Sequence, residues 1–300
     1  MLQIHQINEK LSALNRYVRG QIYYDCGGAN DTLIVNGSGR SGTTWIAELI
    51  NYNNQYRYIF EPFHPKKKYV NLFKNIFSEE LQKQKILQEV ARKILAGRSR
   101  GLWQDRYNKN IFPNKRLIKE VHINLMLQWI IDSYRDIKII HVIRDPYHVC
   151  KSQLIGYEKF GNWSPDIDIL RDKSQKLIFF PRFLKKYFNI CFDSIFCQIF
   201  LRWVIENYFV LRLKNSKNLL VVSYDKIKSQ PGYYLKSIFN HFDIVWDDSV
   251  LSLVNKPSMM TRRNVKSDVG DFPVSLTASE QEFCEELYYV SGLMEFIEGS

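Results

Sequence analysis

The sequence of 300 residues predicts an α/β protein, with a parallel sheet flanked by helices in a single domain whose core begins at about residue 32. Two observations lead to this fold class. Residues 33–50 combine an apolar β-branched run, a glycine-rich loop and an amphipathic helical pattern, which predicts strand, loop and helix. Residues 137–143 form a nearly continuous apolar run, which is typical of a parallel strand covered on both faces.

The loop that follows the first strand predicts a phosphate-binding site. Its glycines let the backbone approach an anion, and the first N–H groups of the next helix point toward that anion. Gly37 and Gly42 have the outer spacing of the P-loop pattern G-x-x-x-x-G-K-[ST], but Thr43 and Thr44 follow where the lysine would stand. The cation comes earlier, at Arg40, whose guanidinium can hold an oxyanion through two parallel bonds. For this loop alone, an ordinary glycine-rich turn is the alternative.

A second candidate site lies at the end of the strand at 137–143. Arg144 stands at its carboxyl end, where ligands bind in open α/β sheets. Pro146 suits the first position of a helix, and Ser152 lies further along it, where it can face the same side as the strand end. A structural pair of Arg144 with Asp145 is the alternative. Two partial motifs about a hundred residues apart are more specific than either one alone.

Both motifs resemble those of the PAPS-dependent sulfotransferases, PAPS being 3′-phosphoadenosine 5′-phosphosulfate. The run RSGTTW, from Arg40 to Trp45, is similar to their 5′-phosphosulfate loop, and the order strand, Arg144, Asp-Pro, helix, Ser152 is similar to their 3′-phosphate site. The resemblance extends from residue 32 to about 290 and is closest to carbohydrate-type and bacterial members. It implies a set of residues that bind the cosubstrate: Gly39, Arg40, Ser41, Gly42, Thr43, Thr44, Trp45, Arg144, Ser152, Tyr224, Arg262 and Arg263.

The same resemblance implies separate roles within this set. Trp45 would stack on adenine, and Tyr224 would lie near it. Arg262 and Arg263 would belong to a loop that closes over the cosubstrate, although a solvated basic loop fits these residues nearly as well.

A general base is predicted at a strand-to-loop junction downstream of the phosphate loop. Glu61 lies between Phe60 and Pro62, and a carboxylate among aromatic side chains is expected to have a raised pKa. On composition alone Glu61 would be a surface residue, but Phe-Glu-Pro resembles the carbohydrate sulfotransferase segment whose glutamate deprotonates the acceptor. His122 is the second candidate and ranks below Glu61. The spacing Lys119-x-x-His122 resembles the Lys-x-His element of cytosolic sulfotransferases, with one residue more.

The rest of the chain predicts further helices and strands around this core. Residues 1–30 look like an amphipathic helix and a turn. Residues 156–192 interleave aromatic and basic side chains and predict an irregular helical cap, which either binds the acceptor or presents a solvated basic face. Hydrophobic patterns predict strands at 116–122 and 218–224 and helices at 78–97, 125–134, 193–214, 231–242 and 277–290.

Composition limits the chemistry and the compartment. A net charge of +11 and a pI of about 9.3 suggest an anionic partner without choosing one. The five cysteines include no C-x-x-C pair and the six histidines no metal-binding cluster, so we expect no metal and a reduced, cytoplasmic protein. No apolar run has the length of a signal-peptide core or a membrane span, so we expect no transmembrane segment.

Together these observations predict an enzyme that moves a sulfuryl group from PAPS to an acceptor hydroxyl or amine. The acceptor would be a sugar, a lipid-linked molecule or another small molecule, and nucleic acid is not an expected partner. Arg40 would neutralise charge on the bridging oxygen, and Glu61 would take the acceptor proton. The alternatives are a P-loop small-molecule kinase, which the missing Gly-Lys-[Ser/Thr] disfavours, and a non-catalytic polyanion-binding protein, which the basic charge allows.

Overall fold

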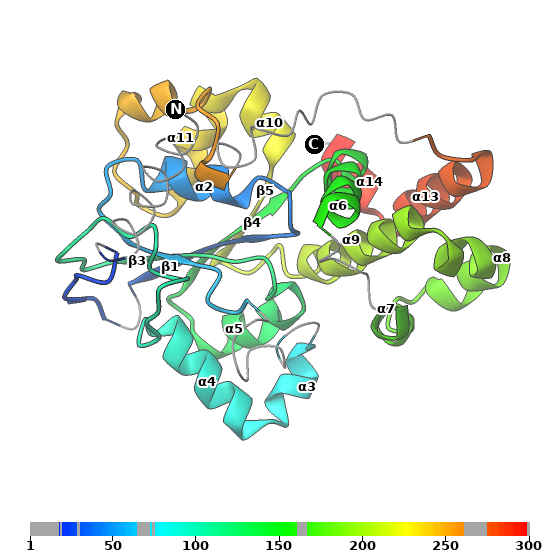
Figure 1. Ribbon diagram of the computed structural model, residues 1–300, viewed down its shortest axis with the longest axis horizontal. Coiled ribbons are helices and arrows are strands. Elements are labelled where there is room, and N and C mark those ends of the chain that lie inside the picture. Colours follow the sequence, from blue (N-terminus) through cyan, green and yellow to red (C-terminus); the bar gives the residue numbers. More distant parts are fainter. Residues whose placement is uncertain are drawn as a thin grey trace, which may run out of the picture.

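A five-stranded parallel sheet, in the order β2-β3-β1-β4-β5, forms the centre of the computed structural model (Figure 1). The predicted α/β class with a parallel, helix-flanked sheet is thereby confirmed. The strands are β1 (Thr32–Gly37), β2 (Arg57–Phe60), β3 (Arg116–Lys119), β4 (Lys138–Ile143) and β5 (Leu219–Ser223). The structure describes residues 18, 20–28, 31–64, 73, 76–160, 167–260 and 275–298, so most of the helix expected within residues 1–30 lies outside the described residues.

The register of the sheet brings the ends of its strands to one edge. β1 is central, with Val35 opposite Lys119 of β3 and Gly37 opposite Val142 of β4. Because all the strands run in the same direction, the segments that follow them leave from this carboxyl edge. The opposite, amino edge carries the residues at which the strands begin.

Alternating side chains of the strands pack against helices on both faces of the sheet. Leu33 and Val35 of β1 belong to the core of one face, and Ile34 belongs to the core of the other. Figure 1 shows the two helical layers above and below the sheet. The first layer consists of α2 (Thr43–Ile50), α10 (Tyr224–Ser229), α11 (Pro231–His241) and the 3₁₀ segment η3 (Asp248–Leu253). The second consists of α3 (Ser78–Gln82), α4 (Lys85–Leu95), the 3₁₀ segment η2 (Asn124–Met126) and α5 (Leu127–Ser133).

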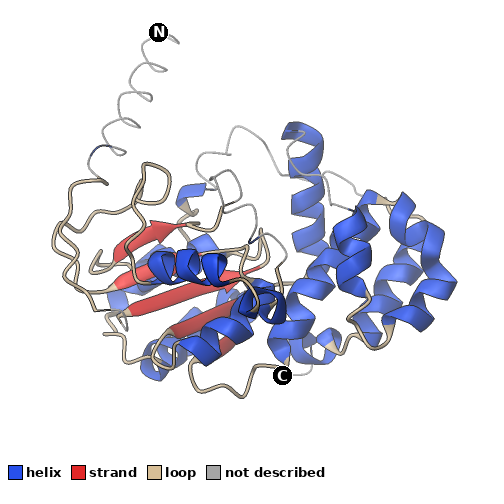
Figure 2. Cartoon of the chain, turned by 90° about the horizontal axis from the view of Figure 1, so that it is seen from below, coloured by secondary structure: helices blue, strands red, loops and turns tan. Residues whose placement is uncertain are grey.

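Beside the sheet, a group of helices forms a second mass that we call the helical lobe (Figure 2). Where residues 156–192 are described they are largely helical, as expected for a helical cap, and one of these helices is kinked at Tyr187 (φ −120°, ψ 20°). Four free cysteines, Cys150, Cys191, Cys197 and Cys284, are buried in the core of the lobe. Its helices are α6 (Pro146–Phe160), α7 (Ile167–Ser174), α8 (Phe180–Asp193), α9 (Ile195–Leu211), α13 (Ala278–Val290) and α14 (Leu293–Glu298).

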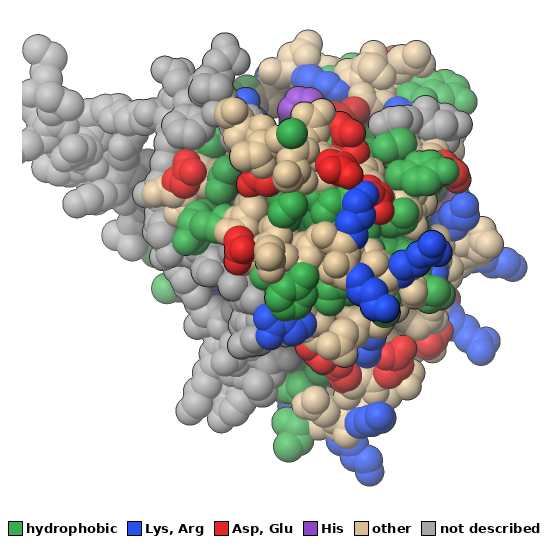
Figure 3. Space-filling view, turned by 90° about the vertical axis from the view of Figure 1, so that its right-hand side faces the viewer, with side chains coloured by type: hydrophobic (Ala, Val, Ile, Leu, Met, Phe, Trp, Pro, Cys, Tyr) green, Lys and Arg blue, Asp and Glu red, His purple; other side chains and the backbone are tan. Residues whose placement is uncertain are grey.

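The surface charge of the molecule is mixed on the face that Figure 3 presents. Lys and Arg side chains there are interspersed with Asp and Glu rather than gathered into one basic field. Within the described part of the chain, no helix is both long and apolar enough to cross a membrane.

Two predicted boundaries are wrong for local reasons. The helix expected at 78–97 is two helices, because the chain leaves helical geometry at Gln84 (φ −116°, ψ 81°) between α3 and α4. The strand expected at 116–122 ends at Lys119. There the Glu120 carboxylate accepts the next backbone N–H groups, which offers the backbone an alternative to the sheet ladder.

At the amino edge, buried ion pairs tie the first residues of β2 and β3 to neighbouring segments. Arg57 is fully buried and donates to Asp105 Oδ1 at 2.8 Å and to Asp25 Oδ2 at 3.0 Å. Arg116 donates to the two carboxylate oxygens of Asp25 at 2.8 and 2.9 Å. Burial alone would raise the pKa of Asp25, but the hydrogen bonds from Arg116 and Arg57 lower it. We call these four residues the amino-edge arginine cluster.

Candidate active site

The loop from Ser38 to Gly42 joins β1 to α2 at the carboxyl edge. Gly42 has a φ of 88°, in the left-handed region, and a Cβ there would lie 2.4 Å from the ring of Tyr224. A side chain at this position would therefore meet both strain and a clash. α2 then begins without a capping side chain or an acidic residue in its first turn, which leaves its first N–H groups available to an anion. Ser41 Oγ is also buried and has no hydrogen-bond partner among the described residues.

Arg40 brings the two predicted motifs together. Its φ of 73° is uncommon for a residue with a side chain. Its Nε donates to Ser152 Oγ in α6 at 2.8 Å, and its carbonyl oxygen accepts from Arg144 Nη1 at 3.4 Å. Partial desolvation and the positive charge of Arg144 lower the pKa of Arg40. No described carboxylate pairs with either arginine, so positive charge is concentrated at this point of the edge.

Tyr224 packs between the two motifs. Its ring centre lies 4.5 Å from Arg144 Cζ and 5.2 Å from the ring centre of Trp45, which it meets edge to face. Trp45 is only 7% exposed and donates from Nε1 to the Val254 carbonyl oxygen at 3.2 Å. The aromatic residues expected near adenine therefore border the phosphate loop, while stacking of Trp45 on adenine stays a prediction.

The other residues predicted to bind the cosubstrate differ in their surroundings. Thr43 and Thr44 are buried in the first turn of α2. The carbonyl oxygen of Gly39 accepts from Gln153 Nε2 at 2.7 Å, a support that the sequence reasoning missed although Gln153 follows Ser152 directly. The predicted Arg262 and Arg263 lie outside the described residues.

Glu61 follows β2 and forms an ion pair with Lys119 at the end of the neighbouring strand β3. Its φ of 42° is again in the left-handed region, where a residue with a side chain is strained. The prediction that the pKa of Glu61 is raised is wrong. Burial alone would raise it, but the positive charge and hydrogen bond of Lys119, with His122 and His64 nearby, lower it instead. Glu61 is therefore held as a carboxylate.

His122 is oriented by a carboxylate that the sequence reasoning missed. Its Nδ1 lies 2.8 Å from Oε1 of Glu120, which is fully buried and also accepts the backbone N–H of Phe63 at 2.8 Å. With Nδ1–H donating to Glu120, Nε2 is left with its lone pair, as a general base requires. The sequence signal for this contact was the spacing of Glu120 and His122, an acidic residue two positions before a histidine at the end of a predicted strand.

A buried polar network connects the phosphate loop with the segment that carries His122. Asn207 of α9 donates to Ser38 Oγ at 3.1 Å, and its Oδ1 lies 3.0 Å from Nε2 of His141. His141 Nδ1 accepts from Asn36 Nδ2 at 3.0 Å, which also donates to Asn124 Oδ1 at 2.7 Å. Burial lowers the pKa of His141 to about 4, so its imidazole is neutral at neutral pH. Asn36 and His141 are polar residues inside apolar strand runs, which was the sequence signal for this network.

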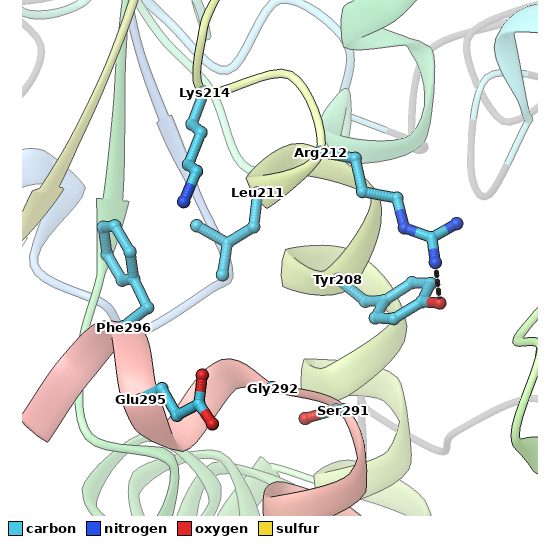
Figure 4. Close-up of a pocket in the computed structure, with 8 residues that line it drawn as sticks. All are labelled: Tyr208, Leu211, Arg212, Lys214, Ser291, Gly292, Glu295 and Phe296. Atoms are coloured by element: carbon cyan, nitrogen blue, oxygen red, sulfur yellow. Dashed lines mark hydrogen bonds between the residues drawn. The ribbon is translucent and has the colours of Figure 1, made fainter. Parts of the chain in front are cut away.

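A pocket of about 470 Å³ lies away from these residues (Figure 4). It is formed where α9 ends and where α13 turns into α14, and Arg212 donates there to the hydroxyl of Tyr208. Because α9 ends just before β5 begins, this pocket is at the amino edge and does not belong to the candidate active site. Its lining residues are Tyr208, Leu211, Arg212, Lys214, Ser291, Gly292, Glu295 and Phe296.

Several solved structures and one family description are similar to this chain. The chain resembles retinol dehydratase, solved with androsterone and the inactive cofactor PAP, at 15% identity and a TM-score of 0.50, covering 95% of this chain and 87% of that one. It also resembles mouse sulfotransferase SULT7A1 complexed with PAP (15% identity, TM-score 0.46, 91% and 88% covered) and sulfotransferase STF9 from Mycobacterium avium (13%, 0.47, 98% and 81%). A search of curated proteins finds no match. The description of the sulfotransferase domain family matches residues 30–268, most of the chain, and the protein therefore belongs to that family.

Proposed function

We propose that this sulfotransferase moves the sulfuryl group of PAPS to a hydroxyl of a carbohydrate, a lipid-linked molecule or another small acceptor by in-line transfer. The observation that carries the proposal is the meeting of Arg40, Ser152 and Arg144 at the carboxyl edge without a described carboxylate. Two solved relatives of the same fold are described as complexes with PAP.

The residues present fit a cosubstrate that carries two separate anionic groups. Arg144 Nε and Ser41 Oγ are buried polar atoms without partners among the described residues, and an oxyanion would supply the missing acceptors. Arg40 and the first N–H groups of α2 would hold the 5′-phosphosulfate, and Arg144 with Ser152 would hold the 3′-phosphate. When bound, PAPS supplies an activated sulfuryl group on a bisphosphate leaving group.

The chain's own groups would stabilise charge and accept a proton. As the acceptor oxygen bonds to sulfur, the bond from sulfur to the bridging oxygen breaks and the bisphosphate leaves; Arg40 would neutralise the negative charge that develops on that oxygen. Lys119, already paired with Glu61, adds a second positive charge on the acceptor side. The acceptor proton passes to a base at the end of β2 or β3.

Two observations favour His122 over Glu61 as that base, although Glu61 stays a candidate. The pKa of Glu61 is lowered by Lys119, which makes its carboxylate a weaker proton acceptor. The buried Glu120 holds His122 through Nδ1, and this contact does not use Nε2. Glu120 then acts through His122 as a positioning residue.

Single substitutions distinguish the two bases. His122→Gln should lower kcat by about a hundredfold or more, as loss of a general base does. Glu120→Gln keeps a hydrogen-bond acceptor for Nδ1–H but removes the charge that faces the ring, so kcat should fall while KM stays near that of the wild type. If Glu61→Gln abolishes transfer while His122→Gln remains active, Glu61 is the base.

Ligand-dependent thermal unfolding tests the cosubstrate. A ligand present at a hundred times its dissociation constant stabilises a protein by about 2.7 kcal/mol, which moves the midpoint by several degrees. We expect a shift with 3′,5′-adenosine bisphosphate and none with ADP plus magnesium, and Arg144→Ala should remove the preference for the 3′-phosphate. A shift with ADP plus magnesium alone would indicate a kinase, and salt-sensitive polyanion binding without nucleotide specificity would indicate a polyanion-binding protein.

A further inference from the structure

A buried arginine next to the candidate site has no ion-pair partner among the described residues. Arg106 is 5% exposed, its Nε is buried without a hydrogen bond, and no described residue forms an ion pair with its guanidinium. Arg57 is also buried, yet it is neutralised by Asp25 and Asp105 and donates further to backbone carbonyl oxygens. Among the described residues, acidic partners are thus supplied to a buried arginine at the amino edge but not to Arg106.

Aromatic rings surround the guanidinium of Arg106. Its Cζ lies 3.7 Å from the ring centre of Trp103, 4.3 Å from that of Phe60 and 4.7 Å from that of Tyr107. Such contacts offset part of the desolvation of the cation and fix its plane. They do not satisfy its N–H groups, because these five donors lie in the guanidinium plane in a fork that matches a planar oxyanion. The aromatic rings therefore orient a guanidinium whose buried Nε–H has no acceptor among the described residues.

The aromatic rings around Arg106 lie next to the proposed base rather than next to the phosphate loop. Phe60 is the last residue of β2, and the ring of Trp103 lies 4.9 Å from His64. The ring of His64 in turn lies 5.4 Å from that of His122. β2 is separated from β1 by β3, which places it about 10 Å from the strand that leads into the phosphate loop. Arg106 is therefore on the side of the site where an acceptor would lie.

We infer that the Arg106 guanidinium binds an anionic group of the acceptor, close to the hydroxyl that receives the sulfuryl group. The group is a carboxylate, a sulfate ester or a phosphate, since all three present oxygens that a guanidinium can hold through two bonds. The acceptor is accordingly a hydroxyl compound that is already acidic before transfer. This inference rests on the proposed function and adds the chemical class of its acceptor.

The stability of the unliganded protein gives a first test that needs no acceptor. Arg106→Met keeps the length and the ring contacts of the side chain and removes an unpartnered buried charge, so the midpoint of thermal unfolding should stay unchanged or rise. Arg100→Met is the matched control, because Arg100 also stacks on an aromatic ring, Tyr23 at 4.3 Å, but is exposed. A fall of several degrees for Arg106→Met alone would show that the protein itself uses this charge, and would overturn the inference.

Transfer of ³⁵S from labelled PAPS to matched acceptors gives the second test. The neutral acceptor is p-nitrophenyl β-glucoside, and the anionic ones are p-nitrophenyl β-glucuronide and the 6-sulfate and 6-phosphate of the glucoside. The wild type should prefer at least one anionic member, and Arg106→Gln should lower kcat/KM for that member by about ten- to a hundredfold, as loss of a charge-assisted bidentate contact does. The neutral acceptor should be unaffected, and so should every acceptor with Arg100→Gln.

Three results would overturn the inference: no preference for any anionic member by the wild type, an equal loss on neutral and anionic acceptors, or no loss at all in Arg106→Gln. The proposed function fails separately. If 3′,5′-adenosine bisphosphate does not bind and no label is transferred to any acceptor, the sulfotransferase proposal fails. In that case, the stability of Arg106→Met still reports whether its guanidinium has a partner in the chain.

Discussion

Arginines lie at both edges of the sheet, but their surroundings differ. At the amino edge, Arg57 and Arg116 share Asp25, and Asp105 completes the neutralisation of Arg57. At the carboxyl edge, Arg40 and Arg144 contact a serine hydroxyl, a backbone carbonyl oxygen and an aromatic ring, and no described carboxylate.

From this difference we propose that one residue type serves stability at the amino edge and anion binding at the carboxyl edge. Removing a charged group from water is unfavourable unless an opposite charge or several hydrogen bonds compensate. The amino edge supplies that compensation within the protein. At the carboxyl edge Arg40 is exposed and Arg144 half-buried, so these charges keep access to water, and in the proposed function an anionic ligand compensates them.

The largest expected effect is at the amino edge. Arg57→Met leaves the fully buried Asp105 without its cation, and breaking such a pair costs about 3–5 kcal/mol of unfolding free energy. Urea unfolding of the two proteins measures it. A loss below about 1 kcal/mol would put Arg57 in the class of surface ion pairs and remove the contrast between the edges.

At the carboxyl edge, the loss should be in turnover rather than in stability. Arg40→Ala should lower kcat by about a hundredfold, as removal of a donor to a developing anion does. Its unfolding free energy should stay at or above that of the wild type, because a cation without an acidic partner among the described residues is removed. Near-normal turnover would reject the role of Arg40, and a large loss of stability would show that its charge is used by the fold.

A smaller effect is expected for His141, which is buried like Arg57 but stays neutral at neutral pH. The pKa of His141 is about 4 in the folded protein and 6.5 in the unfolded chain, so the unfolded state binds the proton first as pH falls. His141 should therefore cost no stability above pH 6.5 and about 2 kcal/mol by pH 5. Chemical unfolding across this range, compared with His141→Gln, isolates the effect. Parallel curves for the two proteins would mean that His141 is charged in the fold.

Much of the architecture was predictable because burial leaves periodic patterns in the sequence. The alternation in Leu33, Ile34 and Val35 marks a strand with two covered faces, and the apolar run 137–143 marks its neighbour. The strand at 116–122 was predicted too long, because hydrogen bonds to the Glu120 side chain depend on how the chain turns after β3 and not on apolar periodicity.

The site was predictable where a motif is local and unpredictable where it is assembled from distant segments. Arg40, Arg144 and Ser152 were identified from two short motifs, and the fold brings them into contact. The sign of the pKa shift of Glu61 was wrong, because Lys119 is its neighbour only across the sheet. The lack of an acceptor for Arg106 Nε among the described residues could not be read from the sequence either, since it depends on which side chains the fold brings near it.

The buried thiols of the helical lobe have a consequence for following its motion in solution. Burial raises the pKa of Cys191 to about 12 and that of Cys150 well above its usual range, so neither presents a thiolate to an alkylating reagent while the lobe is closed. Cys26 is exposed, and we expect it to be labelled first. The slow labelling steps that follow Cys26 would therefore count openings of the lobe, and adding nucleotide or acceptor would show whether occupancy at the carboxyl edge changes their frequency.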